Sequence, residues 1–421
     1  MTTQQPPVPY ATGTHSTEGS APPAAAAPLN LVHVLQTMLG VSSKVSDLIF
    51  SPGRPPQVEL VGKLQGVHYP GLEKLTPAHT SGISKIIMAR NPAAVESLEK
   101  FGSADVSFSA PGLSRFRVNI FMQRGTHAIV MRVIPTEPPR WSNFNLPPQL
   151  KEIAELKTGL VLVTGPTGSG KSSTLAAIID LINEEKHYHI VTIEDPIEFL
   201  HSHKNCTIHQ RELHSDTPDF ARALRAALRQ APKVILVGEM RDRETIEVAL
   251  EAAETGHLVL STLHTIDASK TVDRIIGVFP KNEEASIRAR LAQTFRFIVS
   301  QRLVPRADKN GRIAAIEILK STARTREYME HGEKEGKSLI DAMLQGELEG
   351  MQTFDSVLEK LIRNGTLNRE EALSYASNQG NLRLQLADFD GTPEAAPSPA
   401  KPAPSAPPKS SGNSMLDMLD R

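Results

Sequence analysis

Residues 165–172 have the types and spacing needed to bind the phosphates of a nucleotide. They read GPTGSGKS and match the pattern G-x-x-x-x-G-K-[ST]. Glycines let the backbone curve around an anion, so that several N–H groups point inward. Lys171 is expected to reach the β- and γ-phosphates, and the hydroxyl of Ser172 is expected to ligate Mg²⁺. The residues predicted to line this ATP and Mg²⁺ site are Gly165, Pro166, Thr167, Gly168, Ser169, Gly170, Lys171, Ser172 and Ser173.

The segments on either side of this loop give the motif its expected context. Residues 159–164 are short, apolar and partly β-branched, which predicts a buried strand. Residues 173–182 have the composition of a helix. The start of a helix carries a partial positive charge that favours a bound phosphate. A strand, a phosphate loop and a helix in this order indicate a nucleotide-binding domain.

Two carboxylates follow further predicted strands and are candidates for acting on water or on Mg²⁺. Glu198 lies just after the strand predicted at 188–193, and Glu239 lies just after the one at 234–237. Open α/β sheets place their ligands at the carboxyl ends of the strands. ATP hydrolysis also needs a group that positions water. A helix cap or a surface ion pair is the alternative interpretation of each acid.

Two histidines, His257 and His264, flank the strand predicted at 258–263. A neutral imidazole can donate one hydrogen bond and accept another, so these side chains could sense the state of a phosphate. Structural histidines and a pair of metal ligands are the other interpretations, and the spacing does not separate them.

Three arginines fall on strands predicted in the N-terminal part of the chain. Arg115 and Arg117 lie two residues apart in the strand at 114–121, so both face one side of the sheet. Arg132 lies in the strand at 128–134. These side chains form either a solvated sheet face or a set of cations aimed at a nucleotide.

The chain divides into five segments by composition and pattern. Residues 1–28 and 386–421 are rich in Pro, Ala and Ser and are predicted to be disordered. Residues 29–135 mix short helices with strands, including one strand at 58–64, and predict a small α+β domain. Residues 136–149 are a proline-rich linker. Residues 150–385 alternate strands and helices before becoming mostly helical, which predicts a RecA-like α/β domain with a helical C-terminal part.

Residues 414–421, at the end of the second Pro/Ala/Ser segment, are apolar again and read SMLDMLDR. A short helix that docks elsewhere and a frayed end are both compatible with this pattern.

Composition narrows the class of protein. The net charge is −1, so nothing in the overall charge demands a nucleic acid. The single cysteine, Cys206, excludes a disulfide within the chain and a cysteine-based zinc site. No apolar run approaches the roughly 18–20 residues that span a bilayer. We therefore expect a cytoplasmic protein with no direct membrane insertion.

Together these motifs resemble the PilT/PilU group of type IV pilus retraction ATPases, in the secretion ATPase superfamily. The resemblance covers residues 30–385. It is carried by GLVLVTGPTGSGKSSTLAA at 159–177, TIEDPIEF at 192–199, QRE at 210–212, LVGEMRD at 236–242, AETGHLVLSTLH at 253–264, RFRVN at 115–119 and MQTF at 351–354.

The resemblance implies a homo-hexameric ring of subunits, each with a PAS-like N-terminal domain and a RecA-like motor domain. Such a ring would act at the inner-membrane base of a pilus, on an inner-membrane platform protein and alongside a second PilT-type ATPase. It would hydrolyse ATP to retract the pilus, the process behind twitching motility.

The resemblance also assigns roles to the candidate residues. Glu239 falls on the catalytic Walker B glutamate and Glu198 on the acid of the Asp box, with Lys171 as the catalytic lysine of the loop. The histidines fall on the His box, and the arginines fall among the phosphate-contacting and intersubunit arginines: His257, His264, Arg115, Arg117 and Arg132.

Two departures from the family pattern favour other functions. Lys233 replaces the usual acid before the third strand, where it is expected to change the charge near Glu239. The segment 324–329 retains only Arg326 of the retraction motif. An accessory ATP-binding ring subunit is therefore one alternative. A pilus or type II secretion assembly ATPase is another, and the single cysteine argues against it because such ATPases commonly carry a four-cysteine zinc insertion.

Overall fold

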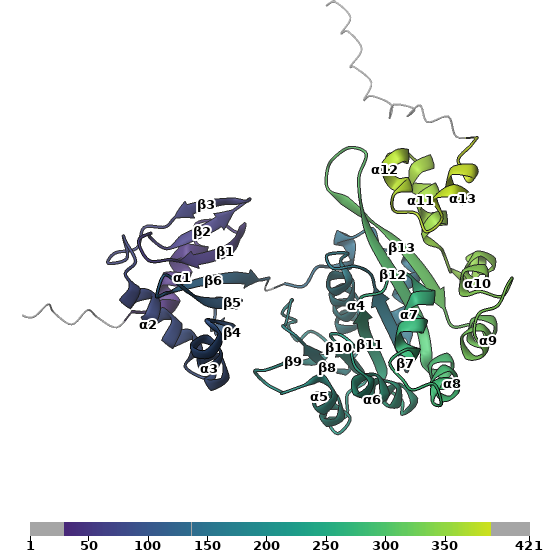
Figure 1. Ribbon diagram of the computed structural model, residues 1–421, viewed down its shortest axis with the longest axis horizontal. Helices are drawn as coiled ribbons and strands as arrows, with labels where there is room; N and C mark the ends of the chain where they lie inside the picture. The colour runs from purple at the N-terminus through teal and green to yellow at the C-terminus, as the bar shows by residue number, and fades with distance from the viewer. Residues whose placement is uncertain (1–28, 136, 389–421) are drawn as a thin grey trace, which may run out of the picture. The chain divides into compact units, whose positions relative to one another are not determined.

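The computed structural model describes residues 29–135 and 137–388 (Figure 1). The predictions for residues 1–28 and 389–421 lie outside the described residues. Leu386, which we assigned to the tail, is fully buried beside the last helix. The described residues form two compact units. One contains 29–135, 137–138 and 191–226, and the other contains 139–190 and 227–388. The grouping of 191–226 with the N-terminal residues differs from the simple division that we predicted.

The N-terminal residues form a six-stranded sheet in the order β3-β2-β1-β6-β5-β4. Every neighbouring pair in this sheet is antiparallel. Its strands are β1 (Val45–Phe50), β2 (Gln57–Leu60), β3 (Lys63–Gly66), β4 (Ser103–Ala110), β5 (Ser114–Gln123) and β6 (Thr126–Ile134). The helices are α1 (Leu31–Leu39), α2 (Pro77–Met88) and α3 (Pro92–Phe101). This is the α+β domain that the sequence predicts.

The single strand predicted at 58–64 is instead a hairpin of β2 and β3. Val61 and Gly62 both have positive φ, at 50° and 77°. Two such residues in succession make a tight two-residue turn that suits antiparallel strands. Because Val61 is apolar, the sequence showed no sign of a turn there, yet the Val61 side chain is 82% exposed in the structure.

The second sheet has seven strands in the order β13-β12-β7-β11-β10-β8-β9. Strand β11 is central in this order. The adjacent strand β7 is parallel to both of its neighbours, β11 and β12, whereas β13 runs antiparallel to β12. The strands are β7 (Gly159–Thr164), β8 (His189–Glu194), β9 (Thr207–Glu212), β10 (Val234–Val237), β11 (Leu258–Leu263), β12 (Phe295–Pro305) and β13 (Arg312–Lys320). The alternation of strands and helices confirms the predicted α/β architecture, although β9 was not predicted.

Ten α-helices and three 3₁₀ turns complete the described part of this region. The helices are α4 (Lys171–Glu185), α5 (Phe220–Ala227), α6 (Arg243–Glu254), α7 (Ala268–Ile276), α8 (Glu284–Thr294), α9 (Ala323–His331), α10 (Leu339–Gln345), α11 (Phe354–Arg363), α12 (Arg369–Leu373) and α13 (Gln379–Gln385). The 3₁₀ turns are η1 (Trp141–Asn143), η2 (Pro148–Glu155) and η3 (Glu347–Glu349). Helices α11 to α13 gather into a small cluster (Figure 1). None of the described helices is long and apolar enough to cross a bilayer.

The sequence Thr217-Pro218 predicts a helix that begins with Thr217 as its cap, but helix α5 begins later, at Phe220. The side chain of Asp219 accepts a hydrogen bond from the Arg222 amide at 2.7 Å, so Asp219 occupies the capping position. Thr217 instead forms a β-bridge with Leu213. We expected Thr217 to cap the helix because a proline follows it, and tertiary pairing overrides that local signal.

Candidate nucleotide site

The phosphate loop depends on glycine at its first position. Gly165 has φ of 144°, and a Cβ added there would lie 2.4 Å from the carbonyl oxygen of Gln301 and 2.6 Å from Oγ of Ser169. No side chain fits this gap without displacing the β12 backbone. The loop is thus packed directly onto the strand that neighbours it.

Lys171 and Ser169 give the loop its chemistry. The Nζ atom of Lys171 donates hydrogen bonds to the carbonyl oxygens of Gly165 and Pro166, at 3.0 and 3.1 Å, and the residue is only 8% exposed. Oγ of Ser169 is buried and has no hydrogen-bond partner in the described part of the chain. A buried hydroxyl without a partner is costly unless a ligand satisfies it. A buried cation beside such a hydroxyl fits the oxygens of a phosphate.

The Mg²⁺-binding hydroxyl that we predicted lies in the first turn of the following helix. Ser172 and Ser173 follow Lys171 at the start of α4, and both are half-buried. Gly170 caps the helix in the left-handed conformation, with φ of 91°. The first turn of a helix has N–H groups without partners inside the helix, and these favour binding of a phosphate together with its Mg²⁺.

Strand β7, which lies between β12 and β11 in the sheet, holds the loop in place. All six of its residues are buried. Its last residue, Thr164, donates a hydrogen bond from Oγ1 to Oγ of Ser300 on β12 at 3.1 Å. The residue from which the phosphate loop starts is therefore held in place by burial and by this hydrogen bond.

Glu239 lies at the same edge of the sheet as the phosphate loop. Strands β10, β11 and β7 pair in register, so that Val237 aligns with Ser261 and Leu263 with Thr164. The loop after β10 is tied to β11, because the Met240 amide donates to the Thr262 carbonyl at 3.2 Å. The residues that follow each of these strands therefore reach one common edge.

Glu239 has two basic neighbours. Its Oε2 atom lies 2.7 Å from Nε of Arg241, and its Oε1 atom lies 3.6 Å from Nε2 of His264. The Glu239 side chain is 18% exposed, whereas those of Arg241 and His264 are 64% and 44% exposed. The carboxylate is thus held by groups that can move with solvent or ligand.

The two histidines lie at opposite ends of β11. His264 follows the strand at the loop edge, whereas His257 precedes it and places its Nδ1 atom 3.0 Å from the Ala252 carbonyl. A strand of this length separates its ends by about 20 Å. Within one chain, therefore, His257 and His264 do not share a site.

Lys233 does not lie near Glu239. It precedes β10, whereas Glu239 follows that strand, and its amide donates to the His189 carbonyl at 2.8 Å. The expected effect of Lys233 on the charge around Glu239 is therefore wrong, because the two residues lie at opposite ends of the strand.

Of the two glutamates at the end of β8, Glu194, the last residue of the strand, is half-buried, and Glu198 beyond it is not. Glu198 is exposed, whereas burial raises the pKa of Glu194, against hydrogen bonds that lower it. Those bonds come from Oγ1 of Thr192 at 2.6 Å and Nε2 of Gln210 at 3.1 Å. The sequence placed carboxylates at this strand end but did not distinguish them. The hydrogen-bond partners Thr192 and Gln210 would have been the signal.

The three arginines occupy one face of the N-terminal sheet. Arg117 pairs with Arg132 in the register of β5 and β6, and Arg115 lies two residues from Arg117. Arg132 contacts Asp47 at 3.0 Å, and Arg115 contacts the buried Glu212 at 3.0 Å. The shared face is as predicted. Two of the three cations already have carboxylate partners.

Glu317 is a buried acid that sequence reasoning missed. It lies on β13, and one of its carboxylate oxygens accepts a hydrogen bond from the Ala268 amide at 2.9 Å. Burial raises its pKa to about 7, against that hydrogen bond and the charge of Arg302, which lower it. Its neighbours in the sequence are all apolar, so the burial of Glu317 can be seen only once β13 is paired with β12.

A family described as type II/IV secretion system protein matches residues 102–382. The chain belongs to this family. The chain is similar to the type IV pilus retraction ATPase PilT of Pseudomonas aeruginosa, with 43% identity over 82% of this chain and 98% of the relative. The PilU ATPase of the same organism is 38% identical over 81% of this chain and 87% of its own length.

Solved structures of secretion ATPases share the fold. A crystal structure of the pilus retraction motor PilT with bound ADP is 40% identical, with a TM-score of 0.73, and covers 85% of this chain and 99% of its own. The Legionella pneumophila ATPase DotB is 29% identical, with a TM-score of 0.71, and covers 88% of this chain and 98% of its own. These matches confirm the expected N-terminal domain and RecA-like domain.

Proposed function

We propose that this chain is a hexameric ATPase motor that hydrolyses ATP to retract type IV pili. The observation that carries the proposal is the phosphate loop, where the buried Lys171 and the unpartnered Ser169 hydroxyl lie at the same sheet edge as Glu239. The similarity to PilT, a type IV pilus retraction ATPase, and to PilU, a type IV pilus ATPase, supplies the biological process.

The residues present fit a nucleotide with Mg²⁺. Lys171 would hold the β- and γ-phosphates, the Ser169 hydroxyl would donate a hydrogen bond to a phosphate oxygen, and Ser172 would ligate the metal. When bound, Mg²⁺ and ATP supply the transferable phosphoryl group and a charge that offsets its oxygens.

Glu239 is the residue that we propose to act on the attacking water. A carboxylate accepts a hydrogen bond from water and so fixes the direction in which an oxygen lone pair points. Arg241 and His264 would hold Glu239 before the reaction, and either could turn toward a phosphate once water takes its place. Glu198 and the arginines Arg115, Arg117 and Arg132 stay candidates for further polar contacts with the nucleotide.

The proposed assembly is a homo-hexamer in the cytoplasm at the inner-membrane base of the pilus. Its partner there would be the platform protein of the pilus, with a second PilT-type ATPase as a further partner. The similarity to both PilT and PilU supports this assignment.

The test is steady-state ATP turnover of the full-length protein beside Glu239→Gln, with the mass of the oligomer measured on the same samples. Glutamine keeps the size of the side chain but is a far weaker base, so turnover should fall by about 10²-fold or more while ATP still binds. Near-zero turnover of the unaltered protein, with ATP bound, would instead favour the accessory ring subunit. Equal turnover of the two proteins would remove Glu239 from the mechanism.

A further inference from the structure

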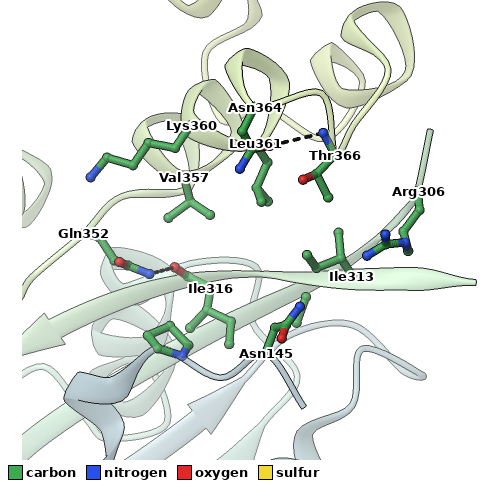
Figure 2. A pocket seen from close by; sticks show the side chains of 12 residues that line it. Asn145, Arg306, Ile313, Ile316, Gln352, Val357, Lys360, Leu361, Asn364 and Thr366 are labelled. Carbon is green, nitrogen blue, oxygen red and sulfur yellow. Dashed lines mark hydrogen bonds between the residues drawn. The ribbon is translucent and has the colours of Figure 1, made fainter. Parts of the chain in front are cut away.

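A cavity of about 350 Å³ lies between β13 and α11, away from the phosphate loop. Figure 2 shows Val357 and Leu361 of α11 pointing toward Ile313 and Ile316 of β13 across it. Ile313, Val357 and Leu361 are only half-buried. We call this cavity the β13–α11 groove.

The floor of the groove extends an apolar core. Ile313, Val357 and Leu361 pack against a buried cluster that includes Phe354 and Leu358. An apolar segment placed in the groove would therefore join an existing core and would need no new one. Burial of apolar surface contributes about 25 cal/mol for each Å² removed from water.

Two cationic side chains lie on the rim of the groove. Arg306 and Lys360 lie at its two ends in Figure 2, and none of the described residues that line it is acidic. Each cation contacts an acid outside the lining, Asp308 at 2.9 Å and Glu347 at 2.5 Å. Both pairs are solvent-exposed, and such pairs are worth about 1 kcal/mol or less. An incoming carboxylate can therefore share or replace these partners.

The chain itself contains a segment of matching chemistry. Residues 414–421 read SMLDMLDR, with Met415, Leu416, Met418 and Leu419 at helical spacing and with Asp417 and Asp420 between and after them. Residues 391–413 contain no Leu, Ile, Val, Met or Phe. Short helices bind apolar grooves through side chains at this spacing.

The course of the chain brings this segment within reach of the groove. Asp388, the last described residue, contacts Arg363 of α11 at 3.0 Å. Asn364, which follows Arg363 in the chain, lines the groove. Residues 389–413 can extend by at most about 90 Å. The tail therefore leaves the described structure beside the groove, with chain to spare.

We propose that residues 414–421 bind in the β13–α11 groove of their own chain. Asp417 and Asp420 would contact Lys360 and Arg306, and the methionines and leucines would cover the apolar floor. The groove is also lined by Asn145 and Pro147, so the docked segment would contact the stretch that follows the N-terminal domain.

Tethering makes even a weak contact effective. A short flexible connection gives an effective concentration on the order of 1 mM, so a segment with a dissociation constant of about 0.1 mM would occupy the groove about nine-tenths of the time.

Cysteine pairs in the full-length protein test this proposal. The only native cysteine, Cys206, is buried. We would compare disulfide formation in Asn364→Cys with Leu416→Cys against the matched pair Asn364→Cys with Ser405→Cys. A merely tethered tail would link position 405 at least as fast, because it is nearer along the chain. Docking predicts that position 416 links about tenfold faster, as expected for the occupancy above.

Charge reversal distinguishes docking of the segment in the groove from random encounters of a tethered tail. In the fast pair, Asp417→Lys with Asp420→Lys should reduce the rate to that of position 405. The same change outside the segment, Asp390→Lys with Glu394→Lys, should leave the rate unchanged. Equal rates at positions 405 and 416, or disulfides that form only between two different chains, would overturn the proposal.

Discussion

At the scale of single residues, the phosphate loop requires glycine at position 165, because there is no room for a side chain there. Gly165 lies against the β12 backbone, whereas a Cβ on Gly168 would meet nothing within 4 Å. Both glycines have positive φ, at 144° and 77°. The pair therefore separates the effect of packing from the effect of backbone strain.

We expect Gly165→Ala to abolish nucleotide binding and to lower the free energy of unfolding by more than about 2 kcal/mol, since the methyl group must displace β12. Gly168→Ala, the control, should cost only about 1 kcal/mol, because an alanine pays for the left-handed backbone alone. Thermal melting and ATP titration measure both effects. Equal losses in the two variants would contradict the packing argument.

Glu317 should make stability depend on pH. Its pKa is about 7 in the folded chain, against an ordinary value of 4.5. Between these values the folded chain holds a proton that the unfolded chain has lost, so the free energy of unfolding falls as pH rises, by about 3 kcal/mol in all. Glu317→Gln cannot ionise and should lose this part of the slope.

Denaturant unfolding between pH 4.5 and 8 measures the slope. The exposed Glu330 provides the control, because Glu330→Gln should keep the slope of the unaltered protein. If Glu317→Gln and the unaltered protein show parallel pH profiles, the folded carboxyl group titrates normally.

At the scale of elements, most strands and helices could be predicted because their apolar residues follow one period. β7, β10 and β11 have the bounds that their patterns predict. β9 was missed because its residues TIHQRE are mostly polar, and the segment is a strand because it pairs with β8. The hairpin at Val61 and Gly62 was missed because a valine rarely has positive φ.

The candidate site divides in the same way. The loop and Glu239 follow strand ends that the sequence marks, so their positions could be predicted. The burial of Glu194 and Glu317 depends on residues from other strands and helices, which no local pattern reports. The separation of His257 from His264 follows from strand length and could have been derived.

Helix α11 begins with a cap that should matter to the groove. Oγ1 of Thr353 accepts a hydrogen bond from the Ser356 amide at 3.3 Å, and Oγ of Ser356 completes the reciprocal contact with the Thr353 amide. Thr353→Ala should lower the free energy of unfolding by about 1 kcal/mol, and Thr353→Ser should restore most of it. Denaturant titration compares them, and equal loss in both would assign the cost to the methyl group.

At the scale of the whole molecule, the proposed ring needs cations to act on the phosphate. Arg117 lies on the face that carries Arg115 and Arg132, whose guanidinium groups already contact acids. We expect Arg117→Ala to lower ATP turnover by about 10³-fold if it serves as an arginine finger. The mass of the oligomer and the affinity for ATP should not change.

The exposed Arg90 of the same domain is the control, and Arg90→Ala should keep full turnover. Unchanged turnover in Arg117→Ala would leave the arginine face as a solvated surface.

The interior position of β7 in its sheet has a consequence for how the molecule unfolds. Both edges of this strand are hydrogen-bonded, and all of its side chains are buried. Its amides can exchange with solvent deuterium only when the surrounding sheet comes apart, so they report global unfolding rather than local fraying. A machine under mechanical load could thus lose peripheral structure while its phosphate loop keeps its shape.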